Sequence, residues 1–459
     1  MTARNEAQQQ EKPLWIFRQI FLPKALTFSP RPVYSSCLSP GGIRPIEYRD
    51  RRRILLHAFR TAALQLIKGK KNMHSYNLYL PTRLVFGENA IEKLPELTKG
   101  FGRKVLIVYG GGSVKRNGIL DRAKELLKDR EVFELSGVEP NPRITTIRRG
   151  VELCKKEGIE WLLPIGAGSV IDSAKAIAAG AFYEGDTWDL VLDSSKIKKA
   201  LPIFVVLTNA ATGSEYDAGG VISNLETDEK LPITSPLLFP VASIMDPAYT
   251  CTVPPKHTAA GAADIFSHTI EQYIVTDGNI LTDAMCEGML KTVIECTPRV
   301  LKNPNDLDAR GQLMMASSFG CCGLLSIGRS PSPWPCHGIE HEISAWHDIT
   351  HGEGLAVITP HWMRWSLTEK TAPRLAQYGV RVFGLAPAAP AMGNAEKAIE
   401  KTSEFFRSIG IPATLSELGV TDEHFEAMAD HVISHWRPLS GAFRPLDREG
   451  ILAILRASL

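Results

Sequence analysis

Three times between residues 105 and 215, a short apolar run is followed by a loop rich in small residues. Each apolar run has the length and composition of a buried strand, and amphipathic stretches separate the first runs. The expected strands cover 105–109, 132–135, 161–165 and 203–207, and the expected helices cover 118–128, 144–157 and 170–179. Strands that alternate with helices form a parallel sheet covered on both faces. The sequence therefore predicts an α/β domain.

The small-residue loops follow three of these strands, at Gly110–Ser113, Gly166–Ser169 and Thr208–Glu215. Ligands of parallel sheets bind at the carboxyl ends of the strands. Glycine-rich turns let backbone N–H groups approach a phosphate, and the N-terminus of the next helix adds partial positive charge. The usual dinucleotide fingerprint, G-x-G-x-x-G with an acid about 20 residues later, is absent. A nucleotide-phosphate site outside the usual Rossmann arrangement is predicted.

The pattern changes after residue 250, where long apolar-periodic stretches such as 259–274 and 283–300 are typical of helices. We therefore predict a boundary at 245–255, with an α/β domain over 73–250 and an all-helical domain over 251–459.

Histidine is concentrated in one part of the chain. Of the 12 histidines, five fall within 25 residues, at positions 337, 341, 347, 351 and 361. Histidine is the commonest metal ligand in proteins. Upstream, Asp264 and His268 are four residues apart in a helical stretch, which places a carboxylate and an imidazole on one face. Together these residues predict a metal site.

Geometry limits which histidines can share one ion. On a single straight helix, His337 and His351 would lie about 21 Å apart. Two ligands of one ion lie no more than about 4.4 Å apart. If both bind the same ion, the helix must break between them, and 348–354 offers a loop. His337 could share a face with His341, and His347 with His351.

Residues 1–72 differ from the rest in charge. They hold 14 Lys and Arg against four Asp and Glu, whereas the remaining 387 residues hold 38 bases and 46 acids. This segment has three interpretations. It is an upstream extension with Met73 as the real start, an organelle transit peptide, or a tail with another function.

The composition narrows the class of protein. A net charge of +2 argues against a nucleic-acid binder, and no apolar stretch reaches the about 18 residues of a membrane span. The eight cysteines show no CxxC pair, which favours reduced thiols in a cytoplasmic protein.

The motifs together resemble those of the iron-containing (group III) alcohol dehydrogenases, in particular the butanol dehydrogenase and NADPH-dependent aldehyde reductase branch. The resemblance runs from about Tyr76 to Leu459. It is carried by Pro81-Thr-Arg-Leu-Val-Phe-Gly87, Tyr109-Gly-Gly-Gly-Ser-Val-Lys115, Gly166-Ala-Gly-Ser-Val-Ile-Asp172, Ala211-Thr-Gly-Ser-Glu215, Asp264-Ile-Phe-Ser-His268 and His337-Gly-Ile-Glu-His-Glu342.

The resemblance implies a nucleotide-binding α/β domain, an all-α metal domain of the dehydroquinate synthase-like fold, a homodimer, and one divalent ion, Fe²⁺ or Zn²⁺. It implies the metal ligands Asp264, His268, His337 and His351, with His341 as a candidate proton relay. The implied cofactor-binding residues are Gly110, Gly111, Ser113, Gly166, Gly168, Ser169, Asp172, Thr208, Thr212 and Lys230. Because the Gly110–Ser113 loop lacks a carboxylate that would repel a 2′-phosphate, NADP(H) is expected in preference to NAD(H).

The chain departs from the family pattern in three places. Pro333 replaces the usual Asp before Trp334 within a proline-rich run, Asn209-Ala210 replaces Leu-Pro, and Asp217 replaces an Asn and is expected to add negative charge near the nucleotide. These departures bear on substrate preference and cofactor affinity, while the metal ligands are intact.

The expected function is the reversible oxidation of a primary alcohol of the butanol type to its aldehyde by hydride transfer with NAD(P)H. The alternatives that share this architecture are a polyol (glycerol-type) dehydrogenase and a dehydroquinate-synthase-like lyase. A non-catalytic metal-binding protein is the alternative from another class. Small alcohols and aldehydes are the expected partners.

Overall fold

The computed structural model describes residues 73–459, and residues 1–72 lie outside the described part. Within this part, a six-stranded parallel sheet has the order β1-β8-β5-β4-β2-β3. The strands are β1 Arg83–Phe86, β2 Lys104–Val108, β3 Glu131–Leu135, β4 Trp161–Gly166, β5 Phe204–Leu207 and β8 Ala242–Met245. The expected strands are all present, to within one or two residues at each end.

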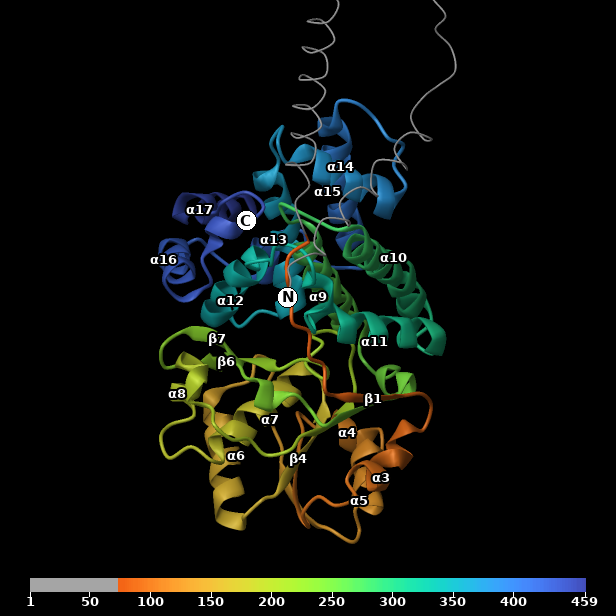
Figure 1. Cartoon of the computed structure of the whole chain (residues 1–459), viewed down its shortest axis with the longest axis vertical. Helices are drawn as coiled ribbons and strands as arrows, with labels where there is room; N and C mark the ends of the chain where they lie inside the picture. The colour runs from red at the N-terminus through yellow and green to blue at the C-terminus, as the bar shows by residue number, and fades with distance from the viewer. Residues whose placement is uncertain (1–72) are drawn as a thin grey trace, which may run out of the picture. The chain divides into compact units, whose positions relative to one another are not determined.

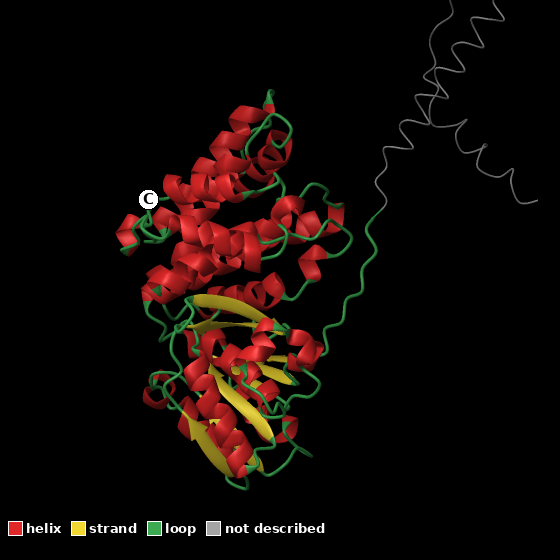
Figure 2. Ribbon diagram, turned by 90° about the vertical axis from the view of Figure 1, so that its left-hand side faces the viewer, coloured by secondary structure: helices red, strands yellow, loops and turns green. Residues whose placement is uncertain are grey.

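Helices cover both faces of the sheet, as the alternating pattern predicts (Figures 1 and 2). Alternate side chains of β2 point to opposite faces, so Leu106 and Val108 pack in one core and Val105 and Ile107 in the other. The helices of this part are α3 Leu94–Leu97, α4 Ser113–Arg116, α5 Ile119–Leu126, α6 Ile144–Glu157, α7 Gly168–Gly180 and α8 Trp188–Leu192.

An antiparallel hairpin, β6 Gly219–Asn224 and β7 Glu229–Thr234, adds a second sheet that the sequence analysis did not predict. It lies between the parallel sheet and the helical part, with β7 against α12 Pro335–His347 (Figure 1). The hairpin therefore brings residues of the α/β part next to the histidine-bearing helix.

The rest of the described chain is helical and has one large hydrophobic core of its own, as expected after residue 250. Its other helices are α9 Pro255–Tyr273, α10 Ile280–Lys302, α11 Leu307–Cys321, α13 His351–Ser366, α14 Ala372–Phe383, α15 Ala391–Ser408, α16 Phe425–His435 and α17 Arg448–Ala457. Among the described residues, no helix is long and apolar enough to cross a membrane. The seven cysteines in residues 73–459 are all free thiols.

Candidate metal and nucleotide site

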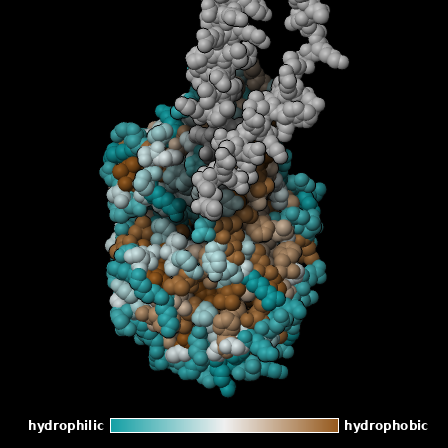
Figure 3. Space-filling model, in the orientation of Figure 1, coloured by the Kyte–Doolittle hydropathy of each residue, from teal (hydrophilic) through white to brown (hydrophobic). Residues whose placement is uncertain are grey.

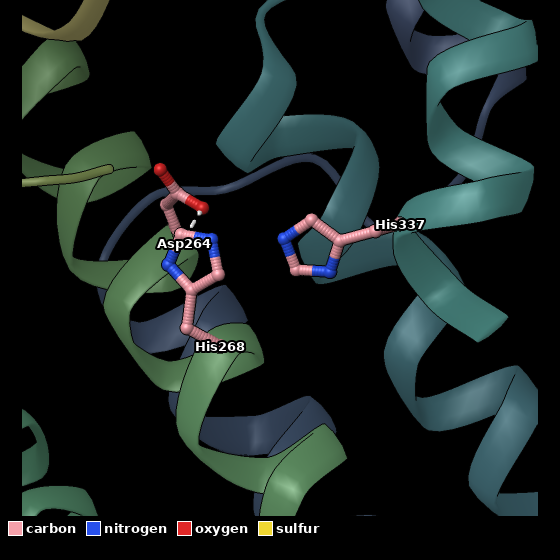
Figure 4. A group of neighbouring side chains, drawn as sticks. All are labelled: Asp264, His268 and His337. Carbon is pink, nitrogen blue, oxygen red and sulfur yellow. Dashed lines mark ion pairs between the residues drawn. The ribbon is translucent and has the colours of Figure 1, made fainter. Parts of the chain in front are cut away.

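Helix α9 presents Asp264 and His268 on one face (Figure 4). The helix begins with Pro255 at its first position, where a missing N–H costs nothing. The four-residue spacing brings Asp264 Oδ1 to 3.5 Å from His268 Nδ1. Both side chains are buried, at 3% and 6% exposure. The pair is therefore held in a fixed, water-poor position.

His337 reaches the same place from the first turn of α12 (Figure 4). Its ring stacks on that of His268, with 4.6 Å between centroids. One ligand atom from each of Asp264, His268 and His337 lies within 4.8 Å of the others. This spacing is close to the limit of about 4.4 Å between two ligands of one ion, so small movements would let all three bind the same ion.

His351 joins the group because the chain breaks after α12. The helix ends at His347, Asp348 adopts a left-handed conformation with φ 49°, and α13 begins at His351. His351 Nε2 then lies 3.8 Å from Asp264 Oδ1. The predicted break is confirmed, and it is shorter than expected, covering only 348–350.

The predicted face shared by His347 and His351 does not form, because the two residues lie on different helices. His347 lies near His424 instead, with 6.3 Å between ring centroids.

Three of the atoms that would bind the ion have no hydrogen-bond partner in the protein. Asp264 Oδ1, His268 Nδ1 and His337 Nε2 are all buried and unpartnered. Buried polar atoms are rarely left so, unless an ion or water completes them. Burial also lowers the pKa of His268 to about 3, which keeps its imidazole neutral. The set of one carboxylate and three imidazoles therefore fits a divalent cation.

Two buried glutamates orient the histidines from behind, and the sequence analysis did not assign them. Glu271 bonds Nδ1 of His337 and Glu340 bonds Nδ1 of His351. Burial by itself would lower the pKa of His337, but the Glu271 carboxylate outweighs it and leaves that pKa raised. A carboxylate on the far nitrogen fixes the ring and strengthens a metal ligand.

His341 faces the site one turn after His337. Its ring lies 5.4 Å from that of His351 and 5.0 Å from the indole of Trp436, which packs edge-on. Burial, with the nearby Lys230 cation, lowers the pKa of His341 well below its usual range. Its Nδ1 is buried and unpartnered. A neutral imidazole with a free nitrogen can accept a proton there.

The proline-rich run that departs from the family pattern forms one wall beside these histidines. Trp334 adopts a left-handed conformation, with φ 59°, and its ring packs edge-on against His268 and His337, at 5.8 and 5.2 Å. Trp436 donates a hydrogen bond from its indole N–H to Pro333 O at 2.8 Å. Trp436, the residue that follows α16, thus holds the run in place.

The three small-residue loops gather at one edge of the sheet, because β5, β4 and β2 are neighbours and run in parallel. A Cβ added to Gly168 would lie 2.4 Å from Thr212. One added to Gly213, where φ is 75°, would lie 2.6 Å from Ser317 O. The glycines therefore permit loops that pack closely, while Gly111 has open space around it.

The other predicted cofactor residues lie on these loops and on the hairpin. Gly110, Gly111 and Ser113 follow β2, and Gly166 and Ser169 flank the start of α7. Thr208 N–H donates to Gly166 O, and Thr212 Oγ1 accepts from Ser214 N–H. Lys230, on β7, lies 3.3 Å from Glu340. The contacts of these residues with a nucleotide stay predictions.

Asp172 holds the neighbouring chain in place by hydrogen bonds to other protein groups. Its Oδ1 accepts from Ser214 Oγ at 2.6 Å, and its Oδ2 accepts from Val221 N–H at 2.9 Å. Burial raises its pKa to about 6. Because both oxygens are engaged, we assign Asp172 to positioning the loop after β5.

Asp217 is paired with a buried cation. Lys175 is fully buried, and its Nζ lies 2.6 Å from Asp217 Oδ1. The expectation that Asp217 simply adds negative charge beside the nucleotide therefore needs correction, because Lys175 offsets it. Lys175 was not predicted from the sequence, although a lysine within a mostly apolar helix is a signal of such a pair.

Two family descriptions match consecutive parts of the chain. Residues 81–247 match the iron-containing alcohol dehydrogenase family, and residues 258–459 match the C-terminal part of the Fe-containing alcohol dehydrogenase family.

Individual relatives cover the same region. NADH-dependent butanol dehydrogenase A of Clostridium acetobutylicum is 46% identical over 389 residues, covering 84% of this chain and all of the relative. The NADPH-dependent aldehyde reductase YqhD of Escherichia coli is 39% identical over 368 residues, covering 79% and 94%. The crystal structure of NADH-dependent butanol dehydrogenase A from Thermotoga maritima has a TM-score of 0.81 at 37% identity, covering 84% and 99%.

Proposed function

The chain belongs to the iron-containing alcohol dehydrogenase family, and we propose that it interconverts primary alcohols and aldehydes of the butanol and butanal type by hydride transfer with NAD(P)H. The observation that carries this proposal is the grouping of Asp264, His268 and His337 within 4.8 Å, with one buried, unpartnered polar atom on each. His351 Nε2 lies 3.8 Å from Asp264 Oδ1 in the same group.

These four residues would hold a divalent ion. Membership of an iron-containing family favours Fe²⁺ over Zn²⁺ as that ion. When bound, the metal supplies Lewis-acid polarisation of the substrate oxygen, and the nicotinamide gives or takes the hydride. The protein's part is to keep the ligands neutral and oriented. Burial does the first for His268, and the carboxylates of Glu271 and Glu340 do the second.

His341 is the group we assign to the proton. Its lowered pKa keeps the imidazole neutral, so that Nδ1 can accept a proton from the alcohol side and return it in aldehyde reduction. The adjoining Trp436 ring limits how far the imidazole can turn.

The nucleotide would lie across the loops that follow β2, β4 and β5. Its pyrophosphate suits the N-terminus of α7, where Gly168 and Ser169 present backbone N–H groups. Lys230 reaches from β7 toward the metal ligands, and it would face the nicotinamide end.

We propose NADP(H) as the preferred cofactor. The Gly110–Ser113 loop carries no carboxylate, and Lys115 and Arg116 follow it after Val114. A Cβ on Gly112 would lie 3.8 Å from Arg116 Nη1, which places the guanidinium beside the loop. The relatives divide on this point, since the clostridial enzyme is named NADH-dependent and YqhD NADPH-dependent.

Arg116 tests the cofactor preference. Arg116→Ala should lower kcat/KM for NADPH by about tenfold or more, the size of a lost charge-assisted hydrogen bond, with little change for NADH. Initial rates with both nucleotides measure this. Equal losses with the two nucleotides would contradict the assignment, and Arg103→Ala, away from the loop, serves as the control.

The activity is tested by assaying the reduction of butanal, propanal and glyoxal with NADPH and NADH, and the oxidation of glycerol with NADP⁺ and NAD⁺. Each assay is run after metal removal and again after adding back Fe²⁺ or Zn²⁺. We expect metal-dependent turnover of the short aldehydes and little or none of glycerol. The absence of metal-dependent turnover with either nucleotide would exclude the proposal.

The free thiols of the described part are in keeping with the cytoplasmic location that we propose.

A further inference from the structure

The two glutamates behind the histidines differ in one respect. Both are buried, at 1% exposure for Glu271 and 0% for Glu340, and each bonds the outer nitrogen of one proposed ligand. The contacts of Glu271 stay within the helical part, where it also accepts the backbone N–H of Cys336. Glu340 alone also contacts the α/β part.

That contact is with Lys230 of the β6–β7 hairpin. Its Nζ lies 3.3 Å from Glu340 Oε2 and 3.5 Å from His351 Nδ1. Lys230 is itself buried, at 4% exposure. Oε2 is thus shared between a cation of the α/β part and the imidazole of a proposed ligand. A change in the position or bonding of one partner alters the electrostatic environment of the other.

The other oxygen of the Glu340 carboxylate, Oε1, is held in a fixed position. Ser344 Oγ donates to Oε1. A Cβ on Gly354 would lie 2.9 Å from Glu340 Cγ and 3.1 Å from Oε1, so a larger residue there would crowd the carboxylate. Because Ser344 holds Oε1, a change at one binding site can reach the other only through the partners of Oε2.

We propose that Glu340 is a positioning residue that couples metal binding in the helical part to nucleotide binding on the α/β part. The inference rests on the proposed function, in which His351 holds the metal and Lys230 faces the nucleotide. If His351 held the metal through Nε2, its Nδ1 would keep the proton and donate to Glu340, and Oε2 would be held where it positions Lys230. Because coupling between two binding sites is reciprocal, the nucleotide must tighten metal binding by the same factor.

The test measures both affinities in the purified protein. Zn²⁺ affinity is obtained by competition with a chromophoric chelator, with and without saturating NADP⁺. NADP⁺ affinity is obtained by calorimetry, with and without Zn²⁺. In the unmodified protein we expect each to tighten the other about fivefold or more.

Glu340→Gln and Glu271→Gln form a matched pair. Both should weaken Zn²⁺ binding by about tenfold or more, because each loosens one ligand. Only Glu340→Gln should bring the coupling factor close to one, while Glu271→Gln should keep it. An unchanged factor in Glu340→Gln, or an equal loss in Glu271→Gln, would overturn the proposal.

Lys230→Met supplies a second route to the same answer. It should abolish the coupling while leaving Zn²⁺ affinity in the nucleotide-free protein within about threefold of the original, which no general loosening of the metal site would do. If Glu340→Gln does not fold because Lys230 is left unpaired, the double variant with Lys230→Met removes that charge. Uncoupled binding of both ligands to the unmodified protein refutes this inference alone, whereas failure to bind either refutes the proposed function as well.

Discussion

His347 and His351 are one helical turn apart in sequence, and only their position relative to a chain break separates their roles. His351 is the first residue of α13 and lies 3.8 Å from Asp264, whereas His347 ends α12 on the side of His424. Residue type and spacing alone do not distinguish them. What does is Asp348, whose left-handed backbone redirects the chain.

We therefore expect His351→Ala to lose stoichiometric metal and more than about 100-fold of the activity, since the metal supplies several kcal/mol of transition-state stabilisation. His347→Ala should keep both within about twofold. Metal analysis of the purified variants and initial rates measure the difference. Equal metal content in the two variants would remove His351 from the proposed ligands.

At this scale the resemblance to the family implied the four candidate ligands, and nothing in the sequence indicated the residues behind them. Aspartate and histidine are recognisable as ligands by type. Glu271 and Glu340 act through partners that lie 66 and 11 residues away, on positions that look like any helical glutamate. Their role depends on burial, which one sequence does not display.

Helix α12 is packed tightly on the side where it meets Trp436. A Cβ on Gly338 would lie 2.8 Å from the indole, so the glycine is required for Trp436 to reach both His341 and Pro333. Most mid-helix glycines cost stability relative to alanine, and this one is kept in spite of that cost.

Gly338→Ala should therefore destabilise the protein by about 1–3 kcal/mol, the usual range for overpacking. Gly288, exposed in the middle of α10 with nothing near its Cβ position, is the matched control, and Gly288→Ala should stabilise by about 0.5–1 kcal/mol. Urea unfolding of both variants gives the two signs. Stabilisation by both substitutions would show that Trp436 moves aside freely.

One turn after Gly338, the same face of α12 carries a buried acid. Glu342 is 6% exposed, and burial, with Glu229 adding to it, raises its pKa to about 8. Nδ1 of His431, on α16, lies 3.3 Å from Glu342 Oε2. In the unfolded chain the carboxyl has its ordinary pKa near 4.5. The folded state therefore binds the proton more strongly than the unfolded state does.

This contribution to stability is complete below pH 4.5 and is lost as the pH rises to about 8. Glu342→Gln cannot ionise, so its melting temperature should fall less than that of the unmodified protein between pH 5 and 8. Glu369→Gln, at an exposed position, is the control and should leave the profile unchanged. Parallel profiles for the unmodified protein and Glu342→Gln would contradict the assignment.

Elements with strong periodicity were predictable, and the hairpin was not. The helix expected at 144–157 has those bounds in the structure. In β6, however, the buried end includes Ser223 and Asn224, so apolar and polar residues do not alternate. The turn also depends on Asp228 at positive φ, with no Asn-Gly or Asp-Gly signal.

At the scale of the whole molecule, the alternation of strands and helices followed by helices alone predicted the two-part architecture. It could not predict how the parts join, because Lys230 and Glu340 are 110 residues apart and neither belongs to a periodic pattern that links them. The junction depends on the unpredicted hairpin.

We propose that the protein is a homodimer. β1 is at the edge of the sheet, and the chain leading into it exposes large apolar side chains, with Met73 at 62%, Tyr76 at 54% and Tyr79 at 66% exposure. Apolar residues also gather across the middle of the face in Figure 3, while hydrophilic ones follow its lower margin. Exposed apolar patches and sheet edges are common association sites.

Deleting residues 1–72 should leave both the dimer and the activity within about twofold of the full chain. The clostridial relative is matched over its whole length by 84% of this chain, and the family match begins at residue 81. Light scattering and initial rates measure the two properties. Deletion of 1–88 is the informative contrast, because it also removes β1, whose residues Arg83 to Phe86 pair with Ala242 to Met245 of β8. That variant should lose stability and activity, since β8 would become an exposed edge. A large loss of activity on deleting 1–72 alone would mean that this segment contributes to the working enzyme.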